Sequence, residues 1–177
     1  MFQRFSAFLV FAVLPIVLAG CNSRVDPLCP SAAALVETSS LTGFAQGATQ
    51  DPSHALYRVV VRNVTTDCSI DRSERTATSS LDIHFLATRT PTGEAAHYRV
   101  PYFVAVRQGA DIQAKRVFWV DFTFDPNAAT ATFDETIDST VIKIANDKQP
   151  YDYQILVGLQ LTKEQLLYNR RIGHYGP

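Results

Sequence analysis

The chain has 177 residues with 16 basic and 17 acidic side chains, a net charge of −1, and 46% of its residues are hydrophobic. This hydrophobic content is that of a globular chain rather than an intrinsically disordered one, and the lack of a basic excess argues against nucleic-acid binding. The length is enough for one domain with a sizeable core.

The first twenty residues have the pattern of a signal peptide. One positive charge, Arg4, precedes an apolar run over residues 5–19, which is too short for an ordinary membrane span. The sequence Leu18-Ala19-Gly20-Cys21 then matches the lipobox of bacterial lipoproteins. The match implies cleavage after residue 20 and acylation of Cys21, and two or three acyl chains would hold the protein on a lipid bilayer. The alternative is a plain secretory signal that ends at a chance cysteine.

The lipobox also divides the chain. We expect a lipoprotein signal peptide over residues 1–20, a lipidated N-terminus and short linker over 21–32, and a single domain over 33–177. Removal of Arg4 leaves 15 basic and 17 acidic residues, a net charge of −2. By analogy with enterobacterial sorting, Asn22 favours the outer membrane, with the domain facing the periplasm.

Two cysteines remain beside Cys21, and an even pair in an oxidising compartment favours a disulfide. A bridge between Cys29 and Cys68 would close a loop of about 40 residues and stabilise the fold by roughly 4 kcal/mol. We expect it to fasten the N-terminal segment to the loop after an early strand. The alternative is two separate buried thiols. A metal site is disfavoured, because no histidine or other cysteine lies at ligand spacing from either one.

From residue 33 onward, short apolar runs separated by turn residues predict strands. The expected strands are 33–45, 55–65, 77–89, 95–107, 113–124, 130–144 and 151–162. Leu81, Ile83 and Phe85 illustrate the period-two pattern of half-buried antiparallel strands. Seven such strands predict an all-β antiparallel sandwich, immunoglobulin-like in architecture, with a small ligand-holding barrel as the alternative. Thr162 and Gln165 form a capping box that predicts a short C-terminal helix.

Strands 95–107 and 113–124 are expected to form a hairpin with Arg107 opposite Gln113. The even-numbered side chains then form an apolar core face, and the odd-numbered face mixes aromatic and charged residues. Its members are Arg99, Phe103, Ala105, Arg107, Lys115, Val117, Trp119 and Asp121. This composition is typical of interface anchors, so we predict partner binding through Arg99, Phe103, Val117, Trp119 and Asp121. One alternative is that the N-terminal segment or the C-terminal helix of the same chain covers this face. Another is that the hairpin is shared between two core faces.

Pro101 cannot donate a hydrogen bond to a strand ladder, so its strand is expected to lie at an edge or to be bulged there.

The sequence gives little support to an enzyme. Asp82 and His84 share a strand face, but no nucleophile motif accompanies them, and alternating polar residues on a solvated face explain the pair. The glycines form neither a dinucleotide-binding fingerprint nor a phosphate-binding loop. We therefore predict no catalytic residue, no metal and no cofactor.

Several blocks resemble a family of uncharacterised alphaproteobacterial envelope lipoproteins. They are Tyr102-Phe103-Val104-Ala105-Val106, Gly158-Leu159-Gln160-Leu161-Thr162, Gln165-Leu166 and Tyr168-Asn169-Arg170. The resemblance implies a lipoprotein without an assigned activity and adds no catalytic residue. The expected function is a non-enzymatic interaction or assembly role in the envelope, with an envelope protein as partner. The alternative is a periplasmic carrier of a small molecule or lipid, held in a cavity between the sheets.

Overall fold

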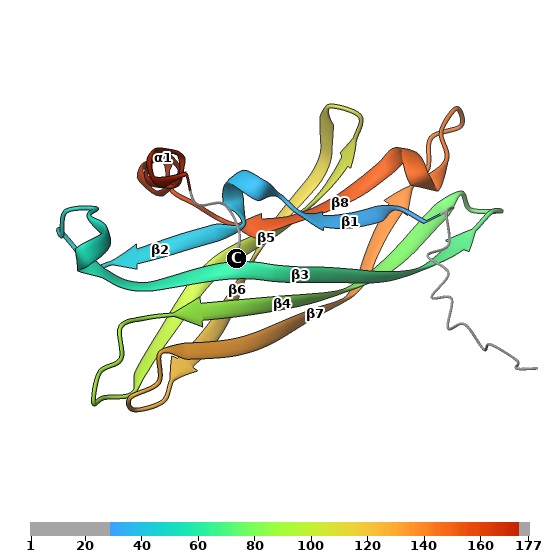
Figure 1. Ribbon diagram of the computed structural model, residues 1–177. Helices are drawn as coiled ribbons and strands as arrows, with labels where there is room; N and C mark the ends of the chain where they lie inside the picture. Colours follow the sequence, from blue (N-terminus) through green and yellow to red (C-terminus); the bar gives the residue numbers. More distant parts are fainter. Residues whose placement is uncertain (1–28, 174–177) are drawn as a thin grey trace, which may run out of the picture.

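The computed structural model describes residues 29–173, so the lipobox and Cys21 lie outside the described residues. Two four-stranded sheets pack face to face (Figure 1). The first sheet has the order β1 (Ser31–Ala34), β8 (Tyr153–Leu159), β5 (Ala96–Gln108), β6 (Asp111–Phe124). The second has the order β2 (Ser40–Phe44), β3 (Ala55–Asp71), β4 (Thr76–Thr88), β7 (Thr130–Lys143). Every ladder is antiparallel except β1–β8. The predicted sandwich is confirmed, and the barrel alternative is wrong for the described residues.

The expected first strand, residues 33–45, is two strands in different sheets. A 3₁₀ turn over Val36–Thr38 carries the chain from β1 to β2, with the amide of Thr38 donating to the carbonyl of Leu35 at 3.0 Å. Residues 35–39 contain no glycine or proline, so the turn left no mark in the sequence. The sandwich therefore has eight strands among the described residues instead of the expected seven.

β3 is longer than predicted. It continues to Asp71, six residues beyond its expected end, and the turn before β4 occupies residues 72–75. The Asp71 carboxylate accepts hydrogen bonds from the Ser73 side chain and amide, which lower the pKa of Asp71. Arg75 completes the turn with φ of 51°, in the left-handed region. Cys68 therefore lies inside a strand and not in a loop.

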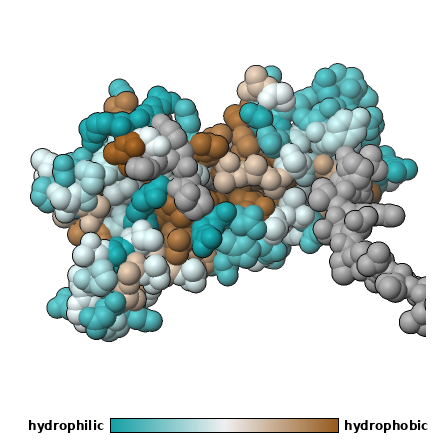
Figure 2. All heavy atoms as spheres, in the orientation of Figure 1, coloured by the Kyte–Doolittle hydropathy of each residue, from teal (hydrophilic) through white to brown (hydrophobic). Residues whose placement is uncertain are grey.

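The core lies between the two sheets. The alternation predicted for residues 81–87 is confirmed, because Leu81, Ile83 and Phe85 are at most 1% exposed. Phe133 stacks between two rings, with centroids 5.2 Å from Phe85 and 4.7 Å from Phe122. Full burial of a leucine, isoleucine or phenylalanine side chain stabilises the folded state by about 1.5–3 kcal/mol. Figure 2 shows apolar residues gathered at the middle of the molecule and hydrophilic residues toward its ends.

One tyrosine brings a polar group into this core. The Tyr102 hydroxyl donates to a Glu135 carboxylate oxygen at 3.3 Å, which links β5 to β7 across the sandwich. Burial and the neighbouring carboxylate raise the pKa of Tyr102, so its hydroxyl stays protonated and remains a donor.

A disulfide joins Cys29 to Cys68, as predicted, with their Cα atoms 6.1 Å apart. Cys29 lies two residues before β1, which is a strand of the first sheet. Cys68 lies on β3, which is a strand of the second sheet. The bridge thus links the start of the described chain covalently to the opposite sheet.

Helix α1 (Lys163–Ile172) begins with the predicted capping box. The Thr162 hydroxyl accepts from the Gln165 amide at 3.2 Å, and the Gln165 side chain accepts from the Thr162 amide at 2.9 Å. Tyr168 packs edge-on against Phe44 of β2, with ring centroids 5.1 Å apart. The buried Asn169 side-chain amide donates to the Ser40 carbonyl at 2.7 Å. The helix thereby covers β2, an edge strand of the second sheet.

Replacing Asn169 is expected to loosen α1 from β2. Asn169→Ala removes the donor to a buried carbonyl, so the free energy of unfolding should fall by about 1–3 kcal/mol. Leu167→Ala is the matched control, because Leu167 lies on the same helix with 53% exposure and should change stability by less than about 0.5 kcal/mol. Urea denaturation followed by circular dichroism compares them. Equal stabilities for the two variants would contradict the assigned role of Asn169.

Candidate functional site

The hairpin of β5 and β6 has the predicted register over most of its length. Tyr102 faces Phe118, and on the other side of the sheet Pro101 faces Trp119 and Arg99 faces Asp121. The expected pairing of Arg107 with Gln113 is wrong, because Arg107 faces Ile112. The turn uses only two residues, Gly109 (φ 58°) and Ala110, so β6 starts at residue 111 and a bulge restores the register at Val106.

β5 is not an edge strand, since it pairs with both β6 and β8. The ladder with β8, however, ends at Tyr102, one residue after Pro101 in the chain. The Pro101 carbonyl accepts from the Gln160 amide at 2.9 Å, and the ladder between β5 and β8 contains no residue paired with Pro101. The prediction of an edge strand is therefore wrong, but Pro101 sits at a local edge where a missing N–H costs little.

We call the exposed residues Arg99, Val117, Trp119 and Asp121 the Trp119 patch. Trp119 is 55% exposed and Val117 is 49% exposed. The Arg99 guanidinium lies 5.4 Å from the centre of the Trp119 ring, and its Nε lies 3.7 Å from an Asp121 oxygen. A cation–π contact and an ion pair thus hold the indole beside two opposite charges. Four of the five predicted partner-binding residues lie together on this surface.

The fifth predicted residue, Phe103, is only 6% exposed. With Ala105 and Leu156 it forms a second, small core on the outer face of the first sheet. The Lys115 ammonium covers the ring at 4.2 Å. Gly158 also lies tightly against it, because a Cβ there would be 2.8 Å from the Phe103 ring and would meet the Thr38 hydroxyl as well. Phe103 is therefore buried and not presented at the surface, and packing within the same chain accounts for this half of the face.

His97 is a member of the surface that the sequence reasoning missed. Its Nε2 lies 3.3 Å from an Asp121 oxygen, and its Nδ1 lies 3.1 Å from the Thr123 hydroxyl. The strand register would have predicted these contacts, because the odd-numbered residues 97, 121 and 123 lie on one face of the hairpin. The His97 side chain is 64% exposed, so nothing excludes water, and the arrangement gives no support to acid–base catalysis.

Asp82 and His84 do not act as a pair. Each makes its own contact across to β7: His84 Nδ1 lies 2.7 Å from an Asp134 oxygen, and Asp82 accepts from the Thr136 hydroxyl at 2.9 Å. The carboxylate beside the imidazole is thus Asp134, on an exposed face of the second sheet. This pattern is that of cross-strand surface pairs rather than of a catalytic triad.

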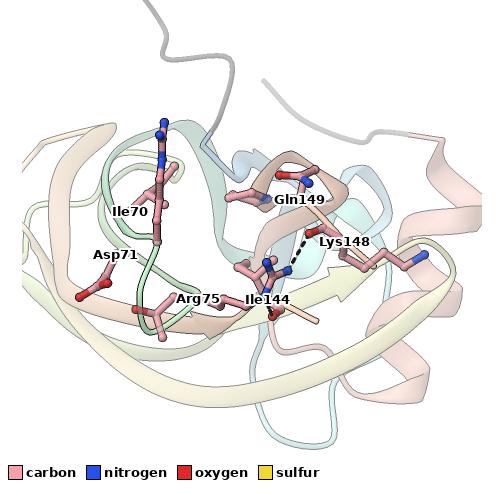
Figure 3. A pocket seen from close by; sticks show the side chains of 9 residues that line it. Ile70, Asp71, Arg75, Ile144, Lys148 and Gln149 are labelled. Atoms are coloured by element: carbon pink, nitrogen blue, oxygen red, sulfur yellow. Dashed lines mark hydrogen bonds between the residues drawn. The ribbon is translucent and has the colours of Figure 1, made fainter. Parts of the chain in front are cut away.

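A pocket of about 270 Å³ opens at one end of the sandwich (Figure 3). Its residues include Ile70, Asp71, Arg75 and Lys148. The Arg75 guanidinium donates to the carbonyls of Ile144 at 3.2 Å and Lys148 at 3.1 Å, so this cation holds the connection between β7 and β8 in place. Its donors are therefore committed to the fold. Among residues 29–173, no three histidine, cysteine, aspartate or glutamate side chains come together to hold a metal ion.

No protein-family model, curated protein or solved structure matches the chain. In the part of the chain that the structure describes, no helix has the length and apolar character that crossing a membrane requires. The described residues form a small, mostly antiparallel β-sandwich that presents an exposed tryptophan beside an arginine–aspartate ion pair on one sheet.

Proposed function

We propose that the protein is a non-enzymatic lipoprotein of the bacterial envelope that binds another envelope protein through the Trp119 patch. The observation that carries the proposal is the exposed indole of Trp119, which contacts Arg99, itself paired with Asp121. Tryptophan and arginine are the residues most enriched at the energetic centres of protein interfaces. A rigid aromatic group on a strand also loses little conformational entropy when it binds.

The anchor is the second part of the proposal. Acylation of Cys21 would hold the domain at a bilayer, with the outer membrane, facing the periplasm, as the proposed location. The resemblance to envelope lipoproteins supports the same location.

The C-terminal helix is a weaker candidate for the binding surface. The Arg170 guanidinium pairs with Glu37 at 3.1 Å, and Arg171 donates to the Gln50 carbonyl at 2.9 Å. Both guanidinium groups already contact other residues of the same chain, so they are less available to a partner. This favours the Trp119 patch as the binding surface. The carrier alternative is also less favoured, since stacked aromatic rings fill the centre between the sheets.

Cross-linking of the tagged full-length chain in a bacterial envelope tests the proposal. Trp119→Ala should reduce the yield of the main cross-linked product by about tenfold or more. The matched control is Tyr151→Ala, because Tyr151 is an aromatic residue of equal exposure, 55%, outside the patch. Cys21→Ala should reduce the same product by releasing the protein from the membrane. Equal yields from Trp119→Ala and Tyr151→Ala would overturn the role of the patch.

A further inference from the structure

The sandwich has four edge strands, and two of them are covered. β2 lies under helix α1, and β1 packs against β3. The other two edges are long: β6 and β7 have 14 residues each, and in the described residues β6 pairs only with β5 and β7 only with β4. A long unpaired edge presents a row of backbone donors and acceptors, which is a template for another strand.

The two open edges differ in regularity. β7 carries an extra residue near its middle. Leu81 of β4 faces Ile137, and Ser79, two residues away on β4, faces Thr140, which is three residues away on β7. Such a bulge disturbs the pairing of an outside strand. β6 has its bulge near the start, and it is regular from Ala114 to Phe124. The residues of β6 include neither glycine nor proline. β6 is therefore the edge that can accept a continuous ladder.

We propose that β6 pairs antiparallel with β6 of a second copy of this chain, around a two-fold axis at Phe118. The proposal rests on the proposed function, because it uses the Trp119 patch and takes the envelope protein that binds there to be a second copy of this chain. In a two-fold antiparallel pair, the axis passes between one residue and its own copy. The numbers of facing residues then add up to twice the number of the residue on the axis.

This register matches the chemistry of the Trp119 patch. With the axis at Phe118, Lys115 faces the partner's Asp121, and Val117 faces the partner's Trp119. Both contacts occur twice in the dimer. They unite the two exposed apolar side chains of the patch and place opposite charges next to them, which is the favourable cross-strand arrangement. Among the ion pairs of the described residues none includes Lys115, whose ammonium contacts only the Phe103 ring in the contacts given above, so it can also pair with a carboxylate of the partner.

Neighbouring registers lack this match. With the axis at Val117, Lys115 faces the partner's Trp119 and Asp121 faces the partner's Gln113. With the axis at Trp119, Lys115 faces the partner's Thr123. With the axis at Arg116, Asp121 faces the partner's Asp111, and like charges directly opposite are destabilising. Of these four registers, only the axis at Phe118 pairs opposite charges.

Cysteine cross-linking tests the dimer and its register together. The full-length chain is expressed in a bacterial envelope as Lys115→Cys, as Asp121→Cys, or as both variants in the same cell. The two positions face each other in the proposed register, within disulfide range, whereas each lies about 20 Å from its own copy. Oxidation should therefore give a disulfide dimer in the mixed cells, at a yield about tenfold above either variant alone. Both side chains are exposed, although the Lys115 ammonium also contacts the Phe103 ring, so circular dichroism of each variant checks that the fold is retained.

Two controls define the register. The parent chain, without an added cysteine, should give no such dimer. Co-expression of Lys115→Cys with Thr123→Cys, two residues out of register, should give far less dimer than the pair at 115 and 121. A product from 115 with 123 equal to that from 115 with 121, or no dimer in any mixture, would overturn the proposal. A ladder of higher multiples would also overturn it, since a two-fold contact closes at two copies.

Charge exchange is an independent test. Lys115→Asp should weaken the dimer about tenfold at low salt, since it places like charges face to face twice. Lys115→Asp combined with Asp121→Lys should restore the association to within about threefold. Sedimentation of the membrane-extracted full-length chain measures both. A double variant as weak as the single one would overturn the proposed contact.

The outcomes separate this dimer from the proposed function. Capture of a different envelope protein that depends on Trp119, together with no dimer by cysteine cross-linking, would overturn the dimer and leave the binding role. A product with the mass of two copies that depends on Trp119 supports both. Neither capture nor dimer would overturn both.

Discussion

Phe103→Ala is expected to lower the free energy of unfolding by about 3–4 kcal/mol. The ring is buried on the outer face of the sheet, among Ala105 and Leu156 and under the Lys115 ammonium. Its removal leaves a cavity that the rigid backbone at Gly158 cannot fill. Urea denaturation, followed by Trp119 fluorescence and by circular dichroism, measures the change.

The control for this variant is Val117→Ala. Val117 faces Phe103 across the hairpin but is 49% exposed, so the smaller side chain should change stability by less than about 0.5 kcal/mol. The contrast separates structure from binding: Phe103 supports the fold, whereas Val117 and Trp119 face outward. A Phe103→Ala protein as stable as Val117→Ala would show that the ring is not part of a core.

Removal of the disulfide is expected to have an effect of similar size. Cys29→Ser with Cys68→Ser opens a loop with a sequence separation of 39 residues, and the unfolded chain then gains entropy equivalent to about 4 kcal/mol. The midpoint of thermal unfolding, measured with and without a reducing agent, tests this. The reducing agent should destabilise the parent protein and leave the double variant unchanged. A parent protein whose midpoint does not respond to full reduction would contradict the prediction.

Local patterns predicted most of the strands and one hairpin in detail. Alternation placed Leu81, Ile83 and Phe85 in the core, because one side of each strand faces the opposite sheet. The short loop after β5 indicated that β5 and β6 pair as a hairpin. The predicted register holds from Val106 to Ala96, beyond the bulge, and it includes the neighbours of Trp119. The helix cap at Thr162 is also a local signal, since it depends on a residue only three positions away.

The errors arise where distant parts of the chain meet. The burial of Phe103 depends on Leu156 and Gly158, which are far away in the sequence, so the hairpin alone could not reveal it. The division between β1 and β2 depends on a turn without glycine or proline. The contact of His97 with Asp121 follows from the register, but the sequence reasoning compared spacing along the chain and not across strands.

The disulfide also determines how the domain carries mechanical load. Tension applied to the chain ahead of Cys29 can pass through the covalent bridge directly into β3, as well as along the backbone into β1. β1 has four residues and one ladder, so by itself it would peel away at low force. β3 has 17 residues and runs along β4 for nearly its whole length, and Cys68 faces Ser79 within that ladder. Such a pull would therefore be shared with one of the longest ladders of the sandwich, and the short strand β1 would not bear it alone.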